Sequence, residues 1–300
     1  MGGTWAGAGQ RDAPVLDYQR AGPTVSRMLV GAQLRRLRET AQVTREEAAE
    51  AIRASDSKIS RLEHGRVGFK LRDVLDLLAR YGITDEAECA TLLAMARHAN
   101  TQGWWHPYSD VIPGWLEPYL GLEQAAQVIR AYEVQFIPGL LQTSDYARAV
   151  IRYGPGGVPE AQIDSRVSLR MRRQELFSQA DRPYLWAVID EAALRRPIGG
   201  AAVMRAQLRR LIEASELPRV TIQVLPLRAT NVAVGVPITL LRFPEGELPD
   251  VVYSEQLGSA LYLERPAETE PYTHLLNRLG TAAGPQTATR AILSQLLKET

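Results

Sequence analysis

Residues 44–64 alternate apolar and polar side chains at the spacing of two short helices joined by a tight turn. The first helical pattern covers about 44–53 and the second about 56–64. In the second pattern Ile59 and Leu62 stand three residues apart and form an apolar face that must be buried. The polar residues on its opposite face are Asp56, Ser57, Ser60 and Arg61. Short polar side chains and an Arg suit hydrogen bonding to base edges, with Arg best matched to O6 and N7 of guanine.

Local signals define the ends of both helices. Thr44 is a good N-cap and Glu47 stands three residues later, which together predict a capping box. Ser55 is suited to cap the second helix, and Gly65 to end it. The residues expected to face inward from the first helix are Ala48, Ala49 and Ile52. Two capped helices with a tight turn and a polar outer face on the second are typical of the helix-turn-helix, whose second helix reads the major groove.

The charge of this region is suited to binding phosphate. Residues 24–80 contain twelve Lys or Arg against eight Asp or Glu, in a chain with 35 basic and 34 acidic residues overall. Contact with the DNA backbone needs such a local surplus. A solvated helical bundle with a few extra Arg is the alternative interpretation. The order of caps, small residues and polar residues in 44–65 favours DNA binding over that alternative.

The segment LRRLRETAQVTREEAAEAIRASDSKISRLEHG carries a family resemblance. Through it, residues 24–81 resemble the Cro/repressor-type (XRE) helix-turn-helix domain. The resemblance implies base contacts by Asp56, Ser57 and Arg61, with Ser60 as a weaker candidate. It implies phosphate contacts by Arg45, Ser55, Lys58, His64 and Arg66. It also implies a structural ion pair between Arg38 and Glu63.

Two residues depart from the family pattern. Arg53 occupies the turn position that is usually Gly. A positive φ at this position would cost Arg on the order of 1 kcal/mol, unless its side chain recovers the cost at a phosphate. Asp56 is unusual in a DNA-reading helix, because a carboxylate repels phosphates and among bases suits only the N4 donor of cytosine.

The chain divides into four parts by its residue pattern. Residues 1–23 are expected to form a flexible tail, and residues 24–100 the helix-turn-helix domain. Residues 101–114 hold two Pro and two Gly and form a connection to a larger domain at 115–300. The five helices expected in the first domain cover about 26–41, 44–53, 56–64, 71–81 and 85–100.

Strand patterns appear only beyond residue 115. Helices are expected there at about 115–126, 143–152, 160–178, 200–215, 266–279 and 286–298. Apolar runs typical of strands occur at 127–139, 184–190, 219–226, 236–243, 250–255 and 259–264. Most of these runs cluster late instead of alternating strictly with helices. The sequence therefore predicts an all-α domain of five helices followed by an α+β domain, in preference to a doubly wound sheet.

Six motifs in residues 110–298 carry a second resemblance. They are FIPGLLQTSDYARAVI (136–151), SRVSLRMRRQELF (165–177), DEAALRRPIGG (190–200), MRAQLRRLIE (204–213), VTIQVLPL (220–227) and VVYSEQLGSALYLE (251–264). In this order they resemble the actinobacterial WhiJ-like (Scr1-type) regulators. The resemblance implies a transcription regulator with an uncharacterised C-terminal domain, which pairs with a small protein encoded nearby in an antitoxin-like manner.

The remaining reactive side chains fit structural roles better than catalytic ones. Asp190 and Glu191 are expected to cap a helix N-terminus. A salt-bridged helix face is favoured over an anion site for Arg166, Arg170, Arg172 and Arg173. Packing at the domain junction is favoured over a ligand pocket for Trp104, Trp105 and Tyr108. The four His residues lack metal-binding spacing, and no phosphate-loop or nucleophile-elbow motif is present in the sequence.

These observations lead to one expected function and one alternative. Single Cys89 excludes an internal disulfide and suits a reducing cytoplasm, and no run approaches the ~20 apolar residues of a membrane span. We expect a cytoplasmic DNA-binding transcription regulator that binds an operator, is not an enzyme and uses no metal or cofactor. Its C-terminal domain would sense a ligand or a partner protein. The alternative is an antitoxin-like protein that binds a small partner encoded nearby and autoregulates its own operon.

A homodimer is also expected. One recognition helix reads too few bases for selective binding, so proteins of this type use two half-sites. The self-interface is expected beyond residue 110, through the strand pair at 251–264 or through the last helix with its apolar residues. Those apolar residues are Ile292, Leu293, Leu296 and Leu297.

Overall fold

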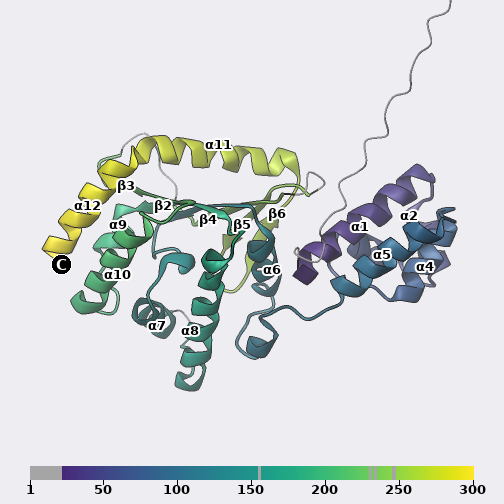
Figure 1. Ribbon diagram of the computed structural model, residues 1–300, viewed down its shortest axis with the longest axis horizontal. Helices are drawn as coiled ribbons and strands as arrows, with labels where there is room; N and C mark the ends of the chain where they lie inside the picture. The colour runs from purple at the N-terminus through teal and green to yellow at the C-terminus, as the bar shows by residue number, and fades with distance from the viewer. Residues whose placement is uncertain (1–21, 155–156, 230–231, 233–234, 245–247) are drawn as a thin grey trace, which may run out of the picture.

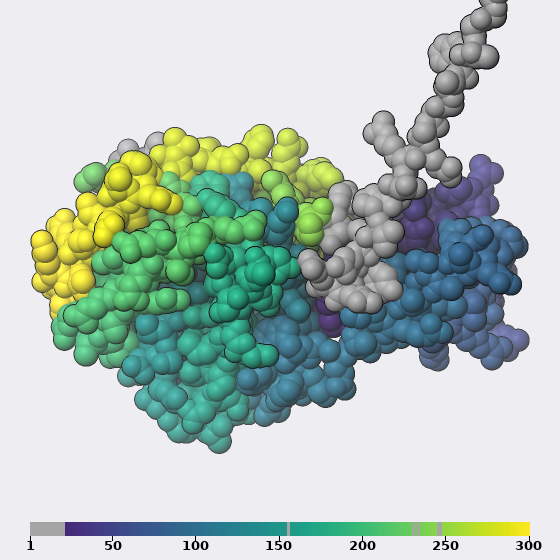
Figure 2. Space-filling view, viewed as in Figure 1, coloured from purple at the N-terminus to yellow at the C-terminus, as the bar shows by residue number. Residues whose placement is uncertain are grey.

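The computed structural model describes residues 22–154, 157–229, 232, 235–244 and 248–300. Five helices come first: α1 Gly22–Thr40, α2 Arg45–Ala51, α3 Asp56–Glu63, α4 Leu71–Arg80 and α5 Glu86–Ala99. They form a lobe beside a larger domain that is built on a sheet (Figures 1 and 2). All five predicted helices are present, and α2 to α5 begin and end within two residues of the predicted bounds.

The larger domain contains six strands and seven α-helices within its described residues. The strands are β1 Val128–Glu133, β2 Tyr184–Asp190, β3 Val220–Leu225, β4 Ile238–Arg242, β5 Val251–Glu255 and β6 Ala260–Leu263. The helices are α6 Glu117–Ala125, α7 Ser144–Tyr153, α8 Glu160–Gln174, α9 Glu191–Arg195, α10 Ala201–Ala214, α11 Pro266–Ala283 and α12 Gln286–Glu299. Each strand lies within one of the six predicted apolar runs.

The sheet is mixed, in the order β3-β2-β1-β4-β5-β6. Strands β1, β2 and β3 are parallel and are joined by helical connections, whereas β4, β5 and β6 continue as antiparallel neighbours. The parallel part alternates strands with helices as a doubly wound sheet would, but the antiparallel part does not. The prediction of an all-α domain followed by an α+β domain is confirmed.

Helices cover both faces of the sheet. Helix α11 lies along one face, where Leu276 and Leu279 share an apolar cluster with residues of β1 to β5 (Figure 1). Helices α7, α8 and α10 lie on the other face, together with Leu293 and Leu296 of α12. Those two α12 residues, at 0% and 3% exposure, belong to the chain's own core. Of the four apolar residues expected to form a self-interface on the last helix, only Ile292 and Leu297 are partly exposed.

Helix α1 begins at Gly22 instead of near Ser26, because its first turn is buried against the larger domain. Pro23 and Thr24 are buried, and α1 packs along α6. A Cβ on Gly121 of α6 would lie 2.2 Å from Oγ1 of Thr24, so glycine is what lets the two helices approach. The predicted flexible tail therefore cannot include residues 22 and 23; its other residues lie outside the described part of the chain.

The connection at 101–114 packs against the larger domain. Trp105 is buried with Leu120 of α6 and Leu169 of α8, and its indole Nε1 donates a hydrogen bond of 3.3 Å to Glu117. A short 3-10 turn at His106–Tyr108 follows. Through this connection and α1, the five-helix lobe is attached to the larger domain at two places.

Candidate nucleic-acid interface

Helices α2 and α3 and the turn between them form the predicted helix-turn-helix. Thr44 Oγ1 accepts a hydrogen bond of 3.2 Å from the N–H of Glu47, whose carboxylate accepts one of 2.8 Å from the N–H of Thr44. The second of these bonds holds the pKa of Glu47 below its usual value. Ser55 Oγ caps α3 by accepting from the N–H of Lys58 at 3.3 Å. The predicted capping box and the Ser55 cap are both confirmed, and they fix where each helix starts.

The turn between α2 and α3 has the left-handed backbone conformation that Gly, the usual residue at position 53 in the family, adopts readily. Arg53 has a φ of 52°, in the left-handed region. Such a φ costs a non-Gly residue on the order of 1 kcal/mol. The Arg53 side chain is exposed and makes no ion pair with any residue that the structure describes, so no described ion pair offsets the cost.

The two faces of α3 differ as predicted. Ile59 and Leu62 are buried at 1% and 2% exposure, against Ala48 and Ala49 of α2 at 0% and 4%. On the opposite face Ser57 and Arg61 are exposed, while Asp56 and Ser60 are partly buried. Among the described residues Arg61 has no ion-pair partner. The helix therefore presents a free guanidinium beside short polar groups, which suits base edges.

The carboxylate of Asp56 is paired with a predicted phosphate-binding residue. Nε of Arg45, at the start of α2, lies 3.1 Å from Oδ1 of Asp56, and both side chains are about half exposed at 45% and 39%. Ion pairs at this exposure contribute at most about 1 kcal/mol. The pair partly neutralises the carboxylate that would repel DNA, and a phosphate could replace Asp56 as the partner of Arg45 at small cost.

Three other residues predicted to contact phosphate differ in whether another group of the protein already binds their side chains. Lys58 Nζ lies 2.6 Å from Oδ2 of Asp73 in α4, so its charge is directed to the neighbouring helix. The Nδ1 of His64 lies 2.6 Å from the carbonyl oxygen of Ser60. Arg66 is exposed at the end of α3. Asp73 could not be predicted as the partner of Lys58, because it belongs to a separate helix and only the packing of α4 brings it there.

The structure places Arg38 and Glu63 in the ion pair that the family resemblance implies. Nε of Arg38 lies 2.5 Å from Oε1 of Glu63, and Nη2 lies 3.1 Å from Oε2. A third bond of 3.0 Å runs from Nη1 to the carbonyl oxygen of Val43. The side chains are 11% and 4% exposed, and the hydrogen bond to Glu63 raises the pKa of Arg38. The pair joins α1 to the end of α3.

Two glycines bring the backbones of α1 and α3 into contact. A Cβ on Gly31 would lie 2.5 Å from the carbonyl oxygen of Leu62. Gly65, at a φ of 63°, ends α3, and a Cβ there would lie 2.6 Å from the backbone nitrogen of Met28. Gly31 was not predicted to have a role, although a glycine inside a helical pattern is a signal of close packing.

The acidic pair at the end of β2 makes structural contacts. Oδ1 of Asp190 accepts from the N–H of Ala192 at 2.9 Å and so caps α9. Glu191 pairs with Arg195 at 2.6 Å and accepts from the N–H of Leu227 at 3.0 Å. Asp190 therefore caps α9 as predicted, whereas Glu191 makes an ion pair within α9 and a bond to the segment after β3 instead of a cap.

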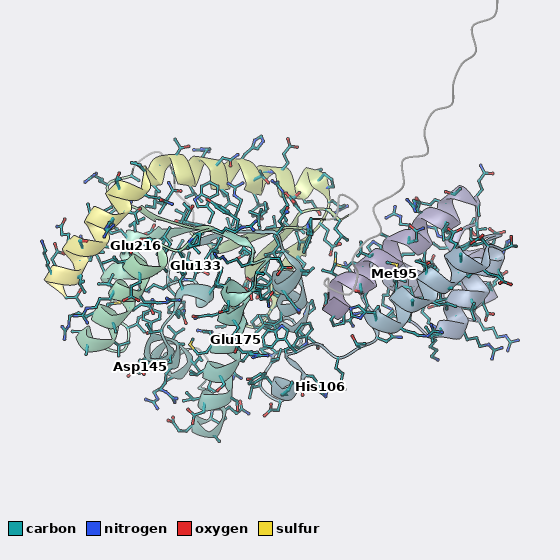
Figure 3. The ribbon with its side chains drawn as sticks, in the orientation of Figure 1. Met95, His106, Glu133, Asp145, Glu175 and Glu216 are labelled. Atoms are coloured by element: carbon teal, nitrogen blue, oxygen red, sulfur yellow. The ribbon has the colours of Figure 1, made fainter. Side chains whose placement is uncertain are left out.

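Three of the four Arg residues of α8 form ion pairs or hydrogen bonds, whereas Nε of Arg166 is buried without a hydrogen-bond partner among the described residues. Arg173 lies 2.7 Å from Glu123 of α6, and Arg170 donates a hydrogen bond of 2.8 Å to Gln142. Arg172 pairs with Glu175. Close by, Glu133 ends β1 in the middle of the larger domain (Figure 3). Burial, and then the charge of Glu255, raises the pKa of Glu133 to about 8 although Arg170 and Arg173 oppose the shift.

The aromatic residues of the connection take part in packing. Trp105 is 3% exposed and meets Trp104 edge to face, with 5.8 Å between ring centroids. Trp104 and Tyr108 are partly buried on the same cluster, and they also line a shallow hollow of about 560 Å³ with residues of α8. The predicted packing at the junction is present, beside an open hollow.

The described residues contain no group of three or more His, Cys, Asp or Glu side chains placed to hold a metal ion. None of the described helices combines the length and apolar character that crossing a membrane requires.

The fold of α1 to α5 and the exposed polar face of α3 define the N-terminal part as a helix-turn-helix domain. A family model described as a helix-turn-helix domain matches residues 29–109. A second model, described as a domain of unknown function (DUF5753), matches residues 116–295, which is more than half of the chain. The chain belongs to this second family. No curated protein and no solved structure matches the chain. The helix-turn-helix domain identifies the protein as a candidate DNA-binding regulator.

Proposed function

We propose that the chain is a sequence-specific transcriptional regulator of the XRE type, whose α3 reads an operator. The observation that carries the proposal is the division of α3 into two faces. Ile59 and Leu62 hold it on the domain core, while Ser57 and Arg61 face solvent with no described residue paired to Arg61. A helix held in this way can enter the major groove and place Arg61 at a guanine.

The surrounding cations support backbone contact. The exposed Arg residues of α2, the turn and the end of α3 are Arg45, Arg53 and Arg66. Each phosphate they neutralise adds about 0.9 to the slope of log affinity against log salt, so several such contacts make binding steeply salt-dependent.

The larger domain, of the WhiJ-like type, would be the sensing part of the regulator in the cytoplasm and not an enzyme. Attachment of α1 to α6 supports this role, because a change in the larger domain can reach α3 through α1. An antitoxin-like protein would bind DNA through the same helix-turn-helix domain. Recovery of one small protein, in fixed ratio with the native chain from its host, would favour that role over ligand sensing.

We propose that the regulator binds DNA as a homodimer. The β5–β6 hairpin supports this, since Leu257 and Leu261 are exposed at 78% and 43% and β6 is the edge strand of the sheet. An unpaired edge with apolar side chains is suited to pairing with a second copy. Sedimentation of the full chain at micromolar concentration tests this, and a monomer would contradict it.

Two substitutions in the full chain test the assignment of α3. Full-length variants are preferable to truncation, because removing the lobe would expose the α6 surface that α1 covers. Arg61→Ala should cost about 1–3 kcal/mol on the operator and little on random DNA, because a base contact is lost. Arg45→Ala should weaken binding to both DNAs similarly and reduce the salt slope by about 1. Arg290→Ala, exposed on α12, is the matched control. Equal losses on both DNAs for Arg61→Ala would contradict the proposal.

A further inference from the structure

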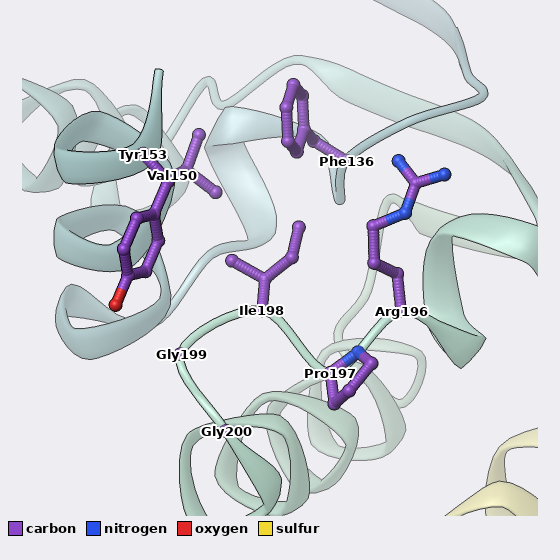
Figure 4. A pocket seen from close by; sticks show the side chains of 8 residues that line it. All are labelled: Phe136, Val150, Tyr153, Arg196, Pro197, Ile198, Gly199 and Gly200. Carbon is purple, nitrogen blue, oxygen red and sulfur yellow. The ribbon is translucent and has the colours of Figure 1, made fainter. Parts of the chain in front are cut away.

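A hollow of about 450 Å³ opens on the larger domain between α7 and the segment that joins α9 to α10 (Figure 4). Its lining residues are Phe136, Val150, Tyr153, Arg196, Pro197, Ile198, Gly199 and Gly200. Phe136 follows β1, and the 196–200 segment follows β2 and α9. The hollow therefore lies beyond the carboxyl ends of two parallel strands, which is where open α/β sheets place ligand sites.

The hollow combines apolar walls with one charged group. Phe136, Val150 and Ile198 are partly buried, and Figure 4 shows Ile198 pointing toward Phe136 between Val150 and Arg196. Arg196 is exposed and makes no ion pair or hydrogen bond through its side chain with any residue that the structure describes. Its neighbour Arg195, in contrast, pairs with Glu191 and Glu299.

The backbone of the 196–200 segment is fixed and already hydrogen-bonded. The N–H of Ile198 bonds to the carbonyl of Arg196 at 2.8 Å, and the N–H of Gly200 to that of Pro197 at 2.9 Å. Gly199 and Gly200 have φ of 79° and 92°, and a Cβ on Gly199 would lie 3.0 Å from Ala149 and Val203. Because these two amides are occupied, an added peptide strand finds few partners here, and recognition depends on the side chains.

The start of α10 adds to the preference for negative charge. The helix follows Gly200 directly, and its first turn has no side-chain cap and no acidic residue. The positive end of a helix favours a nearby anion. The helix end and the charge of Arg196 at the rim of the hollow therefore both favour an anion there.

We propose that the hollow binds a small organic acid, with its carboxylate on Arg196 and its apolar body against Phe136, Val150 and Ile198. A volume of about 450 Å³ lies in the range of pockets for small ligands. A guanidinium matches a carboxylate in charge and in bidentate geometry. This proposal names the ligand class for the sensing role proposed above and rests on it, although binding itself is measurable without DNA.

The test measures how octanoate and its uncharged analogue octanamide displace the fluorescent probe anilinonaphthalene sulfonate from the full-length protein. Octanoate should bind about tenfold or more tightly than octanamide, because only the acid forms a charge-assisted hydrogen bond with Arg196. Arg196→Gln should remove this difference, and Arg209→Gln, on an exposed residue of α10 outside the hollow, should preserve it. Val150→Trp should fill the hollow and weaken both compounds.

Two results would overturn the proposal. One is that octanoate and octanamide displace the probe from the folded wild-type chain equally, or that neither compound displaces it. The other is unchanged octanoate binding in Arg196→Gln. Circular dichroism of each variant shows whether it is folded, and Val150→Trp supplies a second variant at the same site. Arg61→Ala should leave octanoate binding unchanged, so failure of this site and failure of DNA reading are separate results.

Discussion

Removing Glu63 should strongly destabilise the helix-turn-helix lobe. Its side chain is 4% exposed and that of Arg38 is 11% exposed, so Glu63→Ala leaves a nearly buried guanidinium without its carboxylate. Breaking a buried pair in this way costs about 3–5 kcal/mol. The remaining bond from Arg38 to the carbonyl of Val43, with the carboxylate of Glu39 still 3.6 Å from Nη2 of Arg38, places the expected loss near the lower end, about 3 kcal/mol. That is a large part of the ~5–15 kcal/mol that stabilises a typical domain.

Urea denaturation of the full chain, followed by far-UV circular dichroism and by Trp fluorescence, measures this loss. Residues 24–100 contain no Trp, so an early loss of helical signal without a fluorescence change reports the lobe. Asp76→Ala removes the carboxylate of an exposed pair with Arg72 and should cost less than about 0.5 kcal/mol. Replacing both members of the buried pair, as Arg38→Met with Glu63→Leu, should recover most of the stability. A Glu63→Ala midpoint equal to that of wild type would refute the reasoning.

Three other predictions follow from single contacts. Gly31→Ala should destabilise the lobe by about 1–3 kcal/mol because its Cβ would overlap the end of α3, whereas Gly114→Ala, with open space around it, should not; urea midpoints measure both. Asp56→Asn should tighten binding to random DNA, since it removes a negative charge and frees Arg45; an unchanged affinity at low salt would contradict this. Because the pKa of Glu133 is raised to about 8, the folded state holds a proton that the unfolded state has released, so this group makes stability fall as pH rises from about 5 to 8. Glu133→Gln should flatten that fall in urea midpoints taken across this pH range, and an identical slope would contradict the assignment.

The local parts of the structure could be predicted from the sequence. The capping box at Thr44 and Glu47 and the buried face at Ile59 and Leu62 depend on residues within one or two turns of each other. The six strands could also be predicted, because each depends on the apolar run within its own segment. Their order and directions depend on pairing between distant segments, which periodicity does not encode.

The parts that could not be predicted depend on contacts between elements. Gly22 and Pro23 are locally typical of a chain break, yet packing on α6 makes them the first turn of α1. The partner of Lys58 comes from α4. The hollow beside Arg196 exists only because α7 and the 196–200 segment meet there.

The most direct test of DNA reading by α3 is selection from random duplexes, with the full chain and its Arg61→Ala variant in parallel. The wild-type chain should enrich a motif of two half-sites separated by one helical turn or a multiple of it, about 10 bp. The variant should enrich the same motif with one position in each half-site relaxed, because one base contact is lost. If the wild-type chain enriches no motif, or the variant enriches the identical motif with no position relaxed, then α3 does not read DNA through Arg61.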